Sequence, residues 1–359
     1  MEYRPGVTLI VMVRDDEVRL RRCLSSAPKN IAEIIVLDTG SKDGSVAVAK
    51  EFTDKVLESA WQDSFSASLN ILLDAVETEW TLRLDSDEWF ATPVDDALSA
   101  DTARDDVFLY SIPIRNLIPG GMETIVNIRR MWRTHSAMRY EGRIHEQFWA
   151  EQLEPAGVGR YEDVTSFEIL HDGYNLEDST EKTERNLRLV ELELEDNPDR
   201  MYYRAVHADL LYRLNRPEAD EAIDSILHSV VSKRRPPEEA ILAVLFARWM
   251  DRLPDEALGH PQTRKRMQYV TEHFALLPGL LFEVAKLEKR KGNYVAAVDL
   301  YMRIDAIGRN NNADQRISLN PAVFPAAWRE LAECAPLAGR HDLAAYASES
   351  LATLARLQR

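Results

Sequence analysis

Cysteine is nearly absent from this sequence of 359 residues, which contains only Cys23 and Cys334, far apart along the chain. Two distant cysteines do not provide the disulfide framework of a small secreted protein, and they fit a reducing compartment. The simpler interpretation is that both are buried small apolar side chains. Either way, a disulfide framework is excluded.

Long apolar runs are missing as well. No segment approaches the roughly 18 consecutive apolar residues of a membrane-spanning helix, so no transmembrane span is predicted. The first six residues lead directly into a β-prone pattern and lack the apolar core of a signal peptide. A cytoplasmic protein is therefore the expectation.

Positive charge is in short supply. The chain has 44 Lys and Arg against 60 Asp and Glu, which gives a net charge of −16. Because proteins that bind nucleic acid normally carry a basic surface, no nucleic-acid partner is expected. An anionic substrate would need a metal ion or a local cluster of arginines. The apolar content of 45% is ordinary for a globular protein, and the length suggests two domains.

Short runs rich in apolar and β-branched residues predict strands in the first half of the chain. Four of them occur in the first 90 residues, at 7–13, 34–37, 55–57 and 80–84. The first is typical of a strand that is buried on both faces of a parallel sheet. A further strand is predicted at 106–112, followed by a loop at 115–121 that would border an acceptor site.

Helical patterns lie between these strands. The second covers 46–52, with Ser45 as its N-cap, and the third covers 65–76. Strands that alternate with helices predict a mostly parallel sheet with right-handed crossovers. The first helix has four apolar positions, at Val18, Leu20, Cys23 and Leu24.

Acidic residues follow three of the predicted strands, at Asp15, at Asp38, and at Asp85 with Asp87. The carboxyl ends of parallel strands meet at one edge of the sheet, where α/β proteins bind their ligands. Carboxylates combined with phosphate oxygens are the ligands that Mg²⁺ and Mn²⁺ take. These positions predict a metal–diphosphate site, and the alternative is a solvated acidic turn in an acidic chain.

In this order, the segments resemble the amino half of family 2 glycosyltransferases, which have a GT-A fold. The resemblance covers 7–90. Its most specific piece is Ile-Ile-Val-Leu-Asp-Thr-Gly-Ser-Lys-Asp-Gly-Ser at 34–45, and its least specific is the Asp-x-Asp of Asp85 and Asp87. Between them lie Trp61 and the Phe-Ser-Ala that starts at Phe65.

The resemblance implies a nucleoside-diphosphate sugar as donor, usually a UDP-sugar, and a Mg²⁺ or Mn²⁺ cofactor. By resemblance, Asp38 would accept a hydrogen bond from the base, Asp85 would contact the ribose or the metal, and Asp87 would ligate the metal. The alternative for Asp38 and Asp43 is that both are turn and capping carboxylates. The remaining residues expected to bind the nucleotide sugar are Val13, Arg14, Asp15, Asp43, Asn70, Ser86 and Arg143.

The chain departs from the family pattern at one position. Many relatives carry Arg-Asn where this chain has Leu69-Asn70, and that arginine is expected near the diphosphate. Here Arg83 or a later arginine would have to take its place.

A second motif, Arg-Tyr-Glu-Gly-Arg-Ile-His-Glu-Gln at 139–147, resembles the bacterial branch of the family that carries Tyr-x-Gly-x-Ile-His-Glu. Glu146 would be the general base on the acceptor, and His145 would ligate the metal or orient the phosphates. The alternative is a strand-end pair that is hydrogen-bonded into the fold. Four arginines would neutralise the leaving group: Arg129, Arg130, Arg139 and Arg143.

The stretch Ile-Leu-His-Asp-Gly-Tyr at 169–174 also resembles that branch. It makes His171 a candidate third metal ligand or phosphate contact. The alternative for a lone histidine beside a glycine turn is a structural role.

After Ser179 the pattern becomes helical, which predicts an α/β domain at 1–175 and an all-α domain at 176–359. Gly292, Tyr294 and Ala297 match the Gly-x-Tyr-x-x-Ala core of a tetratricopeptide-like repeat. Weaker copies begin at Gly339 and Asn215, and an insert is expected at about 308–320. In architecture only, this half resembles the helical domain of a minority of family 2 enzymes, including those that glycosylate ribosomally made peptides on Ser or Cys. Here the domain would recognise a polypeptide acceptor, form a homodimer or brace the catalytic domain.

The function predicted by this combination is an inverting, metal-dependent glycosyltransferase that uses a nucleoside-diphosphate sugar and a peptide, glycan or other acceptor. The alternative is a non-catalytic nucleotide-binding scaffold whose helical repeats dock a partner protein. A nucleotidyltransferase would want a glycine-rich phosphate loop after the first strand, and Arg-Asp-Asp-Glu at 14–17 is not one.

Overall fold

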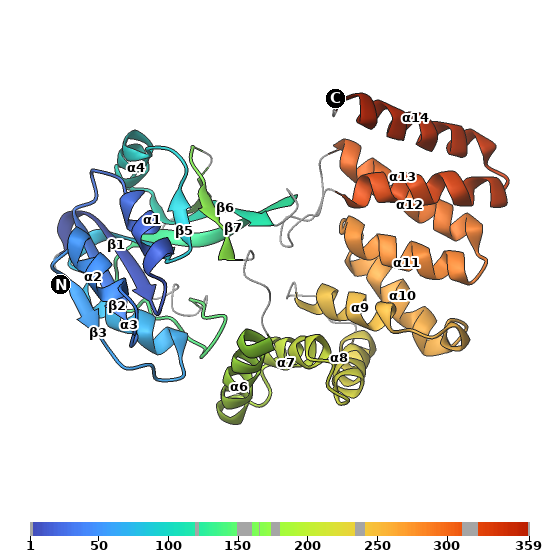
Figure 1. Cartoon of the computed structure of the whole chain (residues 1–359). Helices are drawn as coiled ribbons and strands as arrows, with labels where there is room; N and C mark the ends of the chain where they lie inside the picture. Colours follow the sequence, from blue (N-terminus) through green and yellow to red (C-terminus); the bar gives the residue numbers. More distant parts are fainter. Residues whose placement is uncertain are drawn as a thin grey trace. The chain divides into compact units, whose positions relative to one another are not determined.

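The computed structural model describes residues 3–118, 122–148, 160–164, 166–173, 180–233, 241–310 and 322–357. The chain divides into two compact units, Met1–Asp196 and Asn197–Arg359 (Figure 1). The first unit is α/β and the second is all-α, so the predicted fold class, a GT-A-type domain followed by a helical domain, is confirmed. The division falls after helix α6 (Thr180–Asp196) and not at 175/176, because this helix packs with the first unit.

A single mixed sheet organises the first unit. Its strand order is β3-β2-β1-β4-β7-β6-β9-β5, with β8 also paired to β6. The four strands predicted in the first 90 residues all exist and pair in parallel, whereas β7 runs antiparallel to both β4 and β6. The strands are β1 (Arg4–Val13), β2 (Glu33–Asp38), β3 (Val56–Glu58), β4 (Thr78–Asp85), β5 (Glu88–Phe90), β6 (Val107–Ile118), β7 (Met122–Arg133), β8 (Arg160–Asp163) and β9 (Ile169–His171).

Strand β6 is longer than the sequence pattern indicates. The predicted strand at 106–112 continues to Ile118, so Arg115 and Asn116 belong to a β6–β7 hairpin and not to a loop. The rest of the expected acceptor-site loop, 119–121, lies outside the described residues.

Both faces of β1 are buried, as its continuous apolar pattern predicts. Val11 and Val13 pack in one core with residues of α1 (Glu17–Ser25) and α2 (Ser45–Phe52). Ile10 packs on the opposite face with α3 (Phe65–Ala75). Because side chains alternate along a strand, one apolar run serves both layers. The fourth helix, α4 (Asp95–Thr102), packs through Leu98 in the same core as α1.

Two local predictions are wrong. Val18 is 82% exposed, because residues two positions apart on a helix point to different faces and α1 turns Leu20 and Cys23 toward the sheet. Ser45 is the first residue of α2 and not its N-cap, which is Gly44. The Ser45 hydroxyl instead donates to Asp43 and accepts from the Asp16 amide.

The second unit consists of antiparallel helix pairs around one core. The three predicted repeat copies coincide with helix–turn–helix junctions, where Asn215, Gly292 and Gly339 each have a positive φ of 51–75°. Ala219 and Ala297, which follow two of these turns, are fully buried. The helices are α7 (Met201–Arg213), α8 (Ala219–Lys233), α9 (Ile241–Asp251), α10 (Pro261–His273), α11 (Pro278–Arg290), α12 (Tyr294–Asn310), α13 (Val323–Leu337) and α14 (His341–Leu357).

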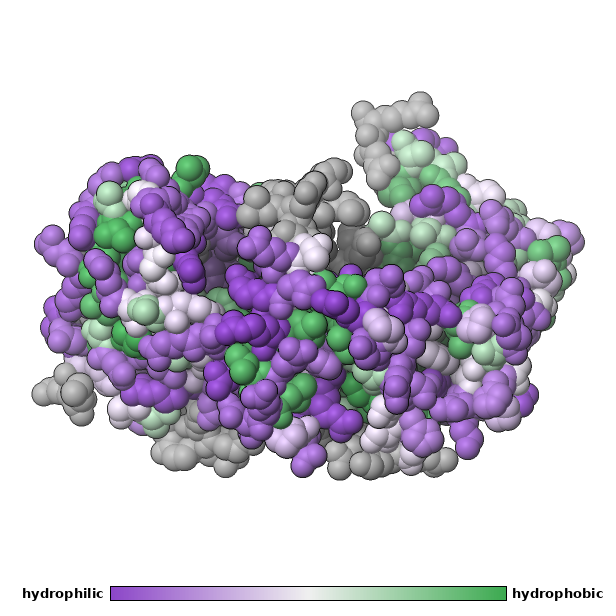
Figure 2. Space-filling model, turned by 60° about the horizontal axis from the view of Figure 1, so that its bottom comes forward, coloured by the Kyte–Doolittle hydropathy of each residue, from purple (hydrophilic) through white to green (hydrophobic). Residues whose placement is uncertain are grey.

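The expected insert begins later than the sequence suggests, since α12 continues through Gly308 to Asn310, and 311–321 lie outside the described residues. Both cysteines are buried and unpaired, as the simpler interpretation expects. Among the described helices, none is long and apolar enough to cross a membrane. Figure 2 shows a face on which hydrophilic residues predominate, with apolar residues scattered between them.

Candidate active site

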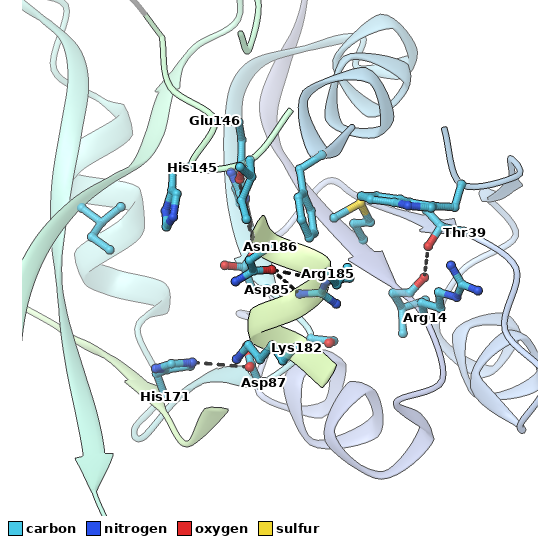
Figure 3. A pocket seen from close by; sticks show the side chains of 18 of the residues that line it. Arg14, Thr39, Asp85, Asp87, His145, Glu146, His171, Lys182, Arg185 and Asn186 are labelled. Carbon is cyan, nitrogen blue, oxygen red and sulfur yellow. Dashed lines mark hydrogen bonds and ion pairs between the residues drawn. The ribbon is translucent and has the colours of Figure 1, made fainter. Parts of the chain in front are cut away.

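The candidate site is a pocket of about 560 Å³ in the first unit. It opens beyond the carboxyl ends of β1 and β4, where Val13, Arg14, Asp85, Ser86 and Asp87 line it. The loop that follows β7 adds Ile144, His145 and Glu146, and β9 adds His171. All three of the predicted acidic strand ends therefore reach the pocket, through Arg14 after β1, Thr39 after β2, and Asp85 and Asp87 at β4. Of the acidic residues predicted at these strand ends, only those at the end of β4 line it. Figure 3 shows these side chains from close by.

A network of two arginines and three carboxylates forms the floor of this pocket. Arg83 donates to Oδ1 of Asp85 at 2.9 Å and to Oε1 of Glu146 at 2.7 Å. Arg130 donates to Oδ2 of Asp85 at 2.7 Å and to the buried Glu88. Both Asp85 oxygens are therefore engaged by guanidinium groups. Burial opposes ionisation of Asp85, but the charges of Arg130 and Arg83 lower its pKa below the usual range.

Glu88 has the opposite character. Its side chain is 3% exposed, and its Oε2 accepts a hydrogen bond from the Asp85 amide at 2.9 Å. Burial raises the pKa of Glu88 to about 7. The Arg130 charge lowers this pKa, and the Asp85 charge raises it. The network thus holds one carboxylate that is firmly ionised and one that titrates near neutrality.

Asp87 and His171 lie next to each other in the pocket. Oδ2 of Asp87 lies 3.4 Å from Nε2 of His171, and Nδ1 of His171 lies 2.7 Å from Oδ1 of Asn116 (Figure 3). Burial disfavours the charged imidazole, but Asp87 raises the pKa of His171. Gly173 permits this close pair, since a Cβ there would lie 2.3 Å from Asp87 Oδ2 and 2.4 Å from His171 Nε2.

The predicted set of three metal ligands is not formed by protein side chains alone. Across the described ranges, which include Asp87, His145 and His171, no three or more His, Cys, Asp or Glu side chains are arranged to hold a metal ion. Figure 3 shows His145 beside Glu146 and His171 beside Asp87. Asp87 and His171 nevertheless offer an oxygen and a nitrogen at one point. That donor set suits a divalent cation that takes its other ligands from phosphates and water.

The Glu146 loop has an unusual backbone. His145 has a φ of 52°, in the left-handed region that is uncommon for residues other than glycine, although histidine adopts it more often than most. This conformation directs two successive side chains, His145 and Glu146, to the same pocket. Such strain is maintained only where surrounding contacts hold it. Here the Arg143 amide donates to Glu193 at 2.8 Å, and Arg83 binds Glu146.

The loops that follow β1 and β2 use their predicted site carboxylates for their own structure. Asp38 is 4% exposed and accepts hydrogen bonds from the amides of Gly40 and Ser41 at 2.9 and 3.0 Å. Asp15 accepts from the Lys42 amide at 2.6 Å. Asp43 accepts a hydrogen bond from the Glu17 amide. Burial raises the pKa of Asp43, but hydrogen bonds from Ser45 outweigh this and lower the pKa. None of the three carboxylates lines the pocket.

Several other predicted residues also point elsewhere. Asn70 clamps the Tyr140 backbone, donating to its carbonyl at 3.0 Å and accepting from its amide at 2.9 Å. The Arg143 guanidinium binds Asp196 at 2.8 Å, and Arg139 binds Asp74 at 2.6 Å. Arg129 is exposed, because it alternates with the buried Arg130 along β7. Of the four arginines expected around the leaving group, only Arg130 lines the pocket.

Sequence reasoning missed two contributions. Asp16 accepts a hydrogen bond from the Ser86 hydroxyl at 2.6 Å and from Arg19 at 2.8 Å, and so links α1 to the Asp85–Asp87 turn. Helix α6 places Lys182, Arg185 and Asn186 in the pocket. Their spacing on one helix face is a usable signal, but an amphipathic helix has the same pattern on any solvated face.

Comparison with known proteins shows which family and which proteins this chain resembles. Residues 8–151 match the model of glycosyl transferase family 2. The chain is similar to a TPR repeat-containing protein of Synechococcus elongatus, with 26% identity over 305 residues that cover 82% of this chain and 64% of the relative. It is also similar to the SPbeta prophage-derived glycosyltransferase SunS of Bacillus subtilis, with 25% identity over 234 residues, 63% of this chain and 53% of the relative.

The chain thus spans 64% and 53% of the length of these two curated relatives. Among solved structures, it is similar to S. aureus TarS 1–349, with 15% identity and a TM-score of 0.37 over 76% of this chain and 92% of that one.

Proposed function

Because residues 8–151 of this chain belong to glycosyl transferase family 2, we propose that the protein transfers a sugar from a nucleoside-diphosphate sugar to a nucleophilic acceptor. The observation that carries the proposal is the convergence of Asp87, Glu146 and His171 on one pocket at the carboxyl ends of β1 and β4. This is the edge at which α/β sheets bind their ligands. The proposed donor is a UDP-sugar, and the proposed acceptor is a hydroxyl or thiol of a peptide or glycan.

Asp87 and His171 are the residues that would hold Mg²⁺ or Mn²⁺. Asp85 is less suited to this role, because both of its oxygens already bind arginines. When bound, the cation would neutralise the charge that develops on the departing diphosphate. Asn116 orients His171 by binding its Nδ1, which leaves Nε2 directed at Asp87.

Glu146 is the proposed general base. Arg83 holds its Oε1, so the carboxylate has a fixed position in the pocket. In the transfer step the acceptor oxygen or sulfur forms a bond to the anomeric carbon, and its proton passes to Glu146. The bond from the anomeric carbon to the diphosphate oxygen breaks, and its electron pair leaves with the nucleoside diphosphate. Attack opposite the leaving group inverts the anomeric configuration.

A second candidate function is a nucleotide-binding scaffold without turnover. It is favoured by the ion pair that engages Glu146 with Arg83, and by the use of Asp38 in its own turn. A scaffold would bind a nucleoside diphosphate but would not consume a sugar nucleotide.

Turnover separates the two functions. The purified protein is incubated with UDP-sugars and GDP-sugars and Mn²⁺, and release of the nucleoside diphosphate is followed with and without candidate peptide and glycan acceptors. We expect release by the wild type, no release by Glu146→Gln, and nucleotide binding by both. Binding without release by the wild type, for every donor and acceptor, would favour the scaffold. Full release by Glu146→Gln would remove the assignment of the base.

A further inference from the structure

The arginines on the pocket floor leave no positive charge for a diphosphate. Arg83 and Arg130 together bind three carboxylates, those of Asp85, Glu88 and Glu146. With Glu88 ionised the cluster is net negative, and with Glu88 protonated it is neutral. A nucleoside diphosphate is anionic, so this floor needs cations from elsewhere.

Those cations come from two elements that converge on the pocket. Arg14 follows β1, and Lys182 and Arg185 project from α6 on one helix face, three positions apart (Figure 3). Partial burial and the Arg14 charge lower the pKa of the Arg185 guanidinium, so these two like charges are close enough to repel each other. Like charges that converge on a pocket are relieved by a bound anion.

Arg185 is also oriented for binding. Its Nε and one terminal nitrogen donate to Oδ1 of Asn186 at 3.3 and 3.0 Å, and its guanidinium lies 5.7 Å from the centre of the Phe65 ring. Both of these partners are neutral, so they orient the guanidinium without forming an ion pair with it. Of the charged groups nearby, Arg14 lowers the pKa of Arg185 and Glu181 raises it. The planar guanidinium is suited to recognition of phosphate oxygens by two parallel hydrogen bonds.

Helix α6 is fixed to the first unit on the C-terminal side of this cationic face. Arg188 binds Asp63 through two hydrogen bonds, one of them 2.8 Å long. Further along, Glu193 is buried and accepts from the Arg143 amide at 2.8 Å, and Asp196 binds the Arg143 side chain. The helix is therefore pre-positioned against the loop that carries Glu146, although it lies beyond the matched residues 8–151.

We propose that α6 supplies the diphosphate-binding cations of the donor site, with Lys182 and Arg185 as the binding groups and Asn186 as the residue that orients Arg185. This assignment rests on the proposed function for the identity of the ligand. These cations would take the place of the arginine that the family resemblance leads one to expect at position 69, where this chain has Leu69. A helix outside the family domain then completes the donor site.

The test compares three probes of the same pocket by isothermal titration calorimetry of the full chain: UDP, inorganic pyrophosphate and uridine, each with Mn²⁺. The variant is Lys182→Gln with Arg185→Gln, which keeps two good helix formers while removing both charges. Lys29→Gln with Lys50→Gln, two exposed positions outside the pocket, controls for the loss of two positive charges. Circular dichroism and the thermal midpoint verify that each variant folds.

We expect the double variant to bind UDP and pyrophosphate about tenfold more weakly, with a shallower salt dependence, and to bind uridine unchanged. Arg185→Lys should keep part of the affinity, since it retains the charge but loses the planar fork. Equal UDP affinity in the wild type and the double variant would overturn the assignment and leave the proposed function standing.

The two proposals also fail in different ways. A wild type that binds pyrophosphate through Lys182 and Arg185 but neither binds nor turns over any nucleoside-diphosphate sugar would overturn the proposed function and support the role of α6. A wild type that binds none of the three probes would overturn both. A double variant that loses uridine binding together with UDP binding would indicate a distorted pocket and would contradict the specific role of the two cations.

Discussion

Arg83 donates one hydrogen bond to Glu146 at 2.7 Å while the same guanidinium binds Asp85 at 2.9 Å. The strand residue thus ties the proposed base to the carboxylate at the end of β4. The Arg83 side chain is 10% exposed, so its contacts are shielded from water and are stronger than surface ion pairs. This bridge couples the position of Glu146 to the sheet.

Replacement of Arg83 by lysine should separate charge from geometry. Lysine keeps the positive charge but cannot bind two carboxylates in the plane of a fork. We expect Arg83→Lys to lower kcat at least about tenfold with a small change in donor KM, because the base is displaced while the cation site is intact. Steady-state kinetics with the accepted donor measures both constants. A variant with normal kcat would show that the Arg83–Glu146 contact does not position the base.

Gly173→Ala should disturb the cation site more than the fold. The added Cβ would meet the ends of the Asp87 and His171 side chains at 2.3 and 2.4 Å, and both ends can move. We expect a loss of stability of about 1 kcal/mol, together with a clear loss of the Mn²⁺-dependent part of nucleotide binding. Gly279→Ala in α11 is the matched control, since a Cβ there meets nothing within 4 Å. If Gly173→Ala bound Mn²⁺ and nucleotide normally, the Asp87–His171 pair would not be the cation site.

Stability should depend on pH through Glu88. Its pKa is raised from 4.5 to about 7 by burial, so the folded protein binds more protons than the unfolded chain between these values. The stability from this group is fully present below about pH 4.5 and is lost as the pH rises through 7. We expect the wild type to lose roughly 1 kcal/mol per pH unit relative to Glu88→Gln over this window. Urea unfolding at pH 5, 6, 7 and 8 measures the difference; parallel curves for the two proteins would contradict a raised pKa.

Release of the Glu146 loop from α6 should reduce catalysis and leave nucleotide binding largely intact. Glu193→Ala removes the acceptor of the Arg143 amide, which holds the backbone next to His145 and its positive φ. We expect kcat to fall several-fold, because a less ordered Glu146 spends less time in the geometry that the reaction requires. Glu195→Ala, at an exposed position of the same helix, is the control. Equal effects of the two substitutions would show that the loop does not depend on Glu193.

Much of the first unit follows from local sequence signals. A strand that is buried on both faces has no solvent-facing side, so apolar and polar residues need not alternate along it. The continuous apolar run of β1 therefore predicts two buried faces, and the structure confirms them. The acidic residues at strand ends are brought to one edge of the sheet, since parallel pairing aligns those ends. These outcomes depend on periodicity and order, which a single sequence contains.

The destinations of individual polar side chains are harder to predict. Asn70 binds the backbone of a residue 70 positions away, whereas Asp38 binds amides two and three positions away. Both are polar residues in segments that resemble the family, and the sequence gives no sign of this difference. The cations of α6 reach the pocket through tertiary contacts such as Arg188–Asp63, which span 125 residues. Motif position identifies the edge where a ligand binds, but long-range packing decides which side chains reach it.

The most direct test of the account is a thermal-shift panel of UDP, GDP, TDP and CMP, each with and without Mn²⁺, on the wild type and on Asp87→Ala. A ligand that binds only the folded protein stabilises it by about 2.7 kcal/mol at a hundredfold excess over Kd. We predict a Mn²⁺-dependent thermal shift for one nucleoside diphosphate in the wild type. Asp87→Ala should lose this shift, while its thermal midpoint without ligand stays equal to that of the wild type. No shift with any nucleotide, or an equal shift in Asp87→Ala, would contradict a metal-dependent donor site in this pocket.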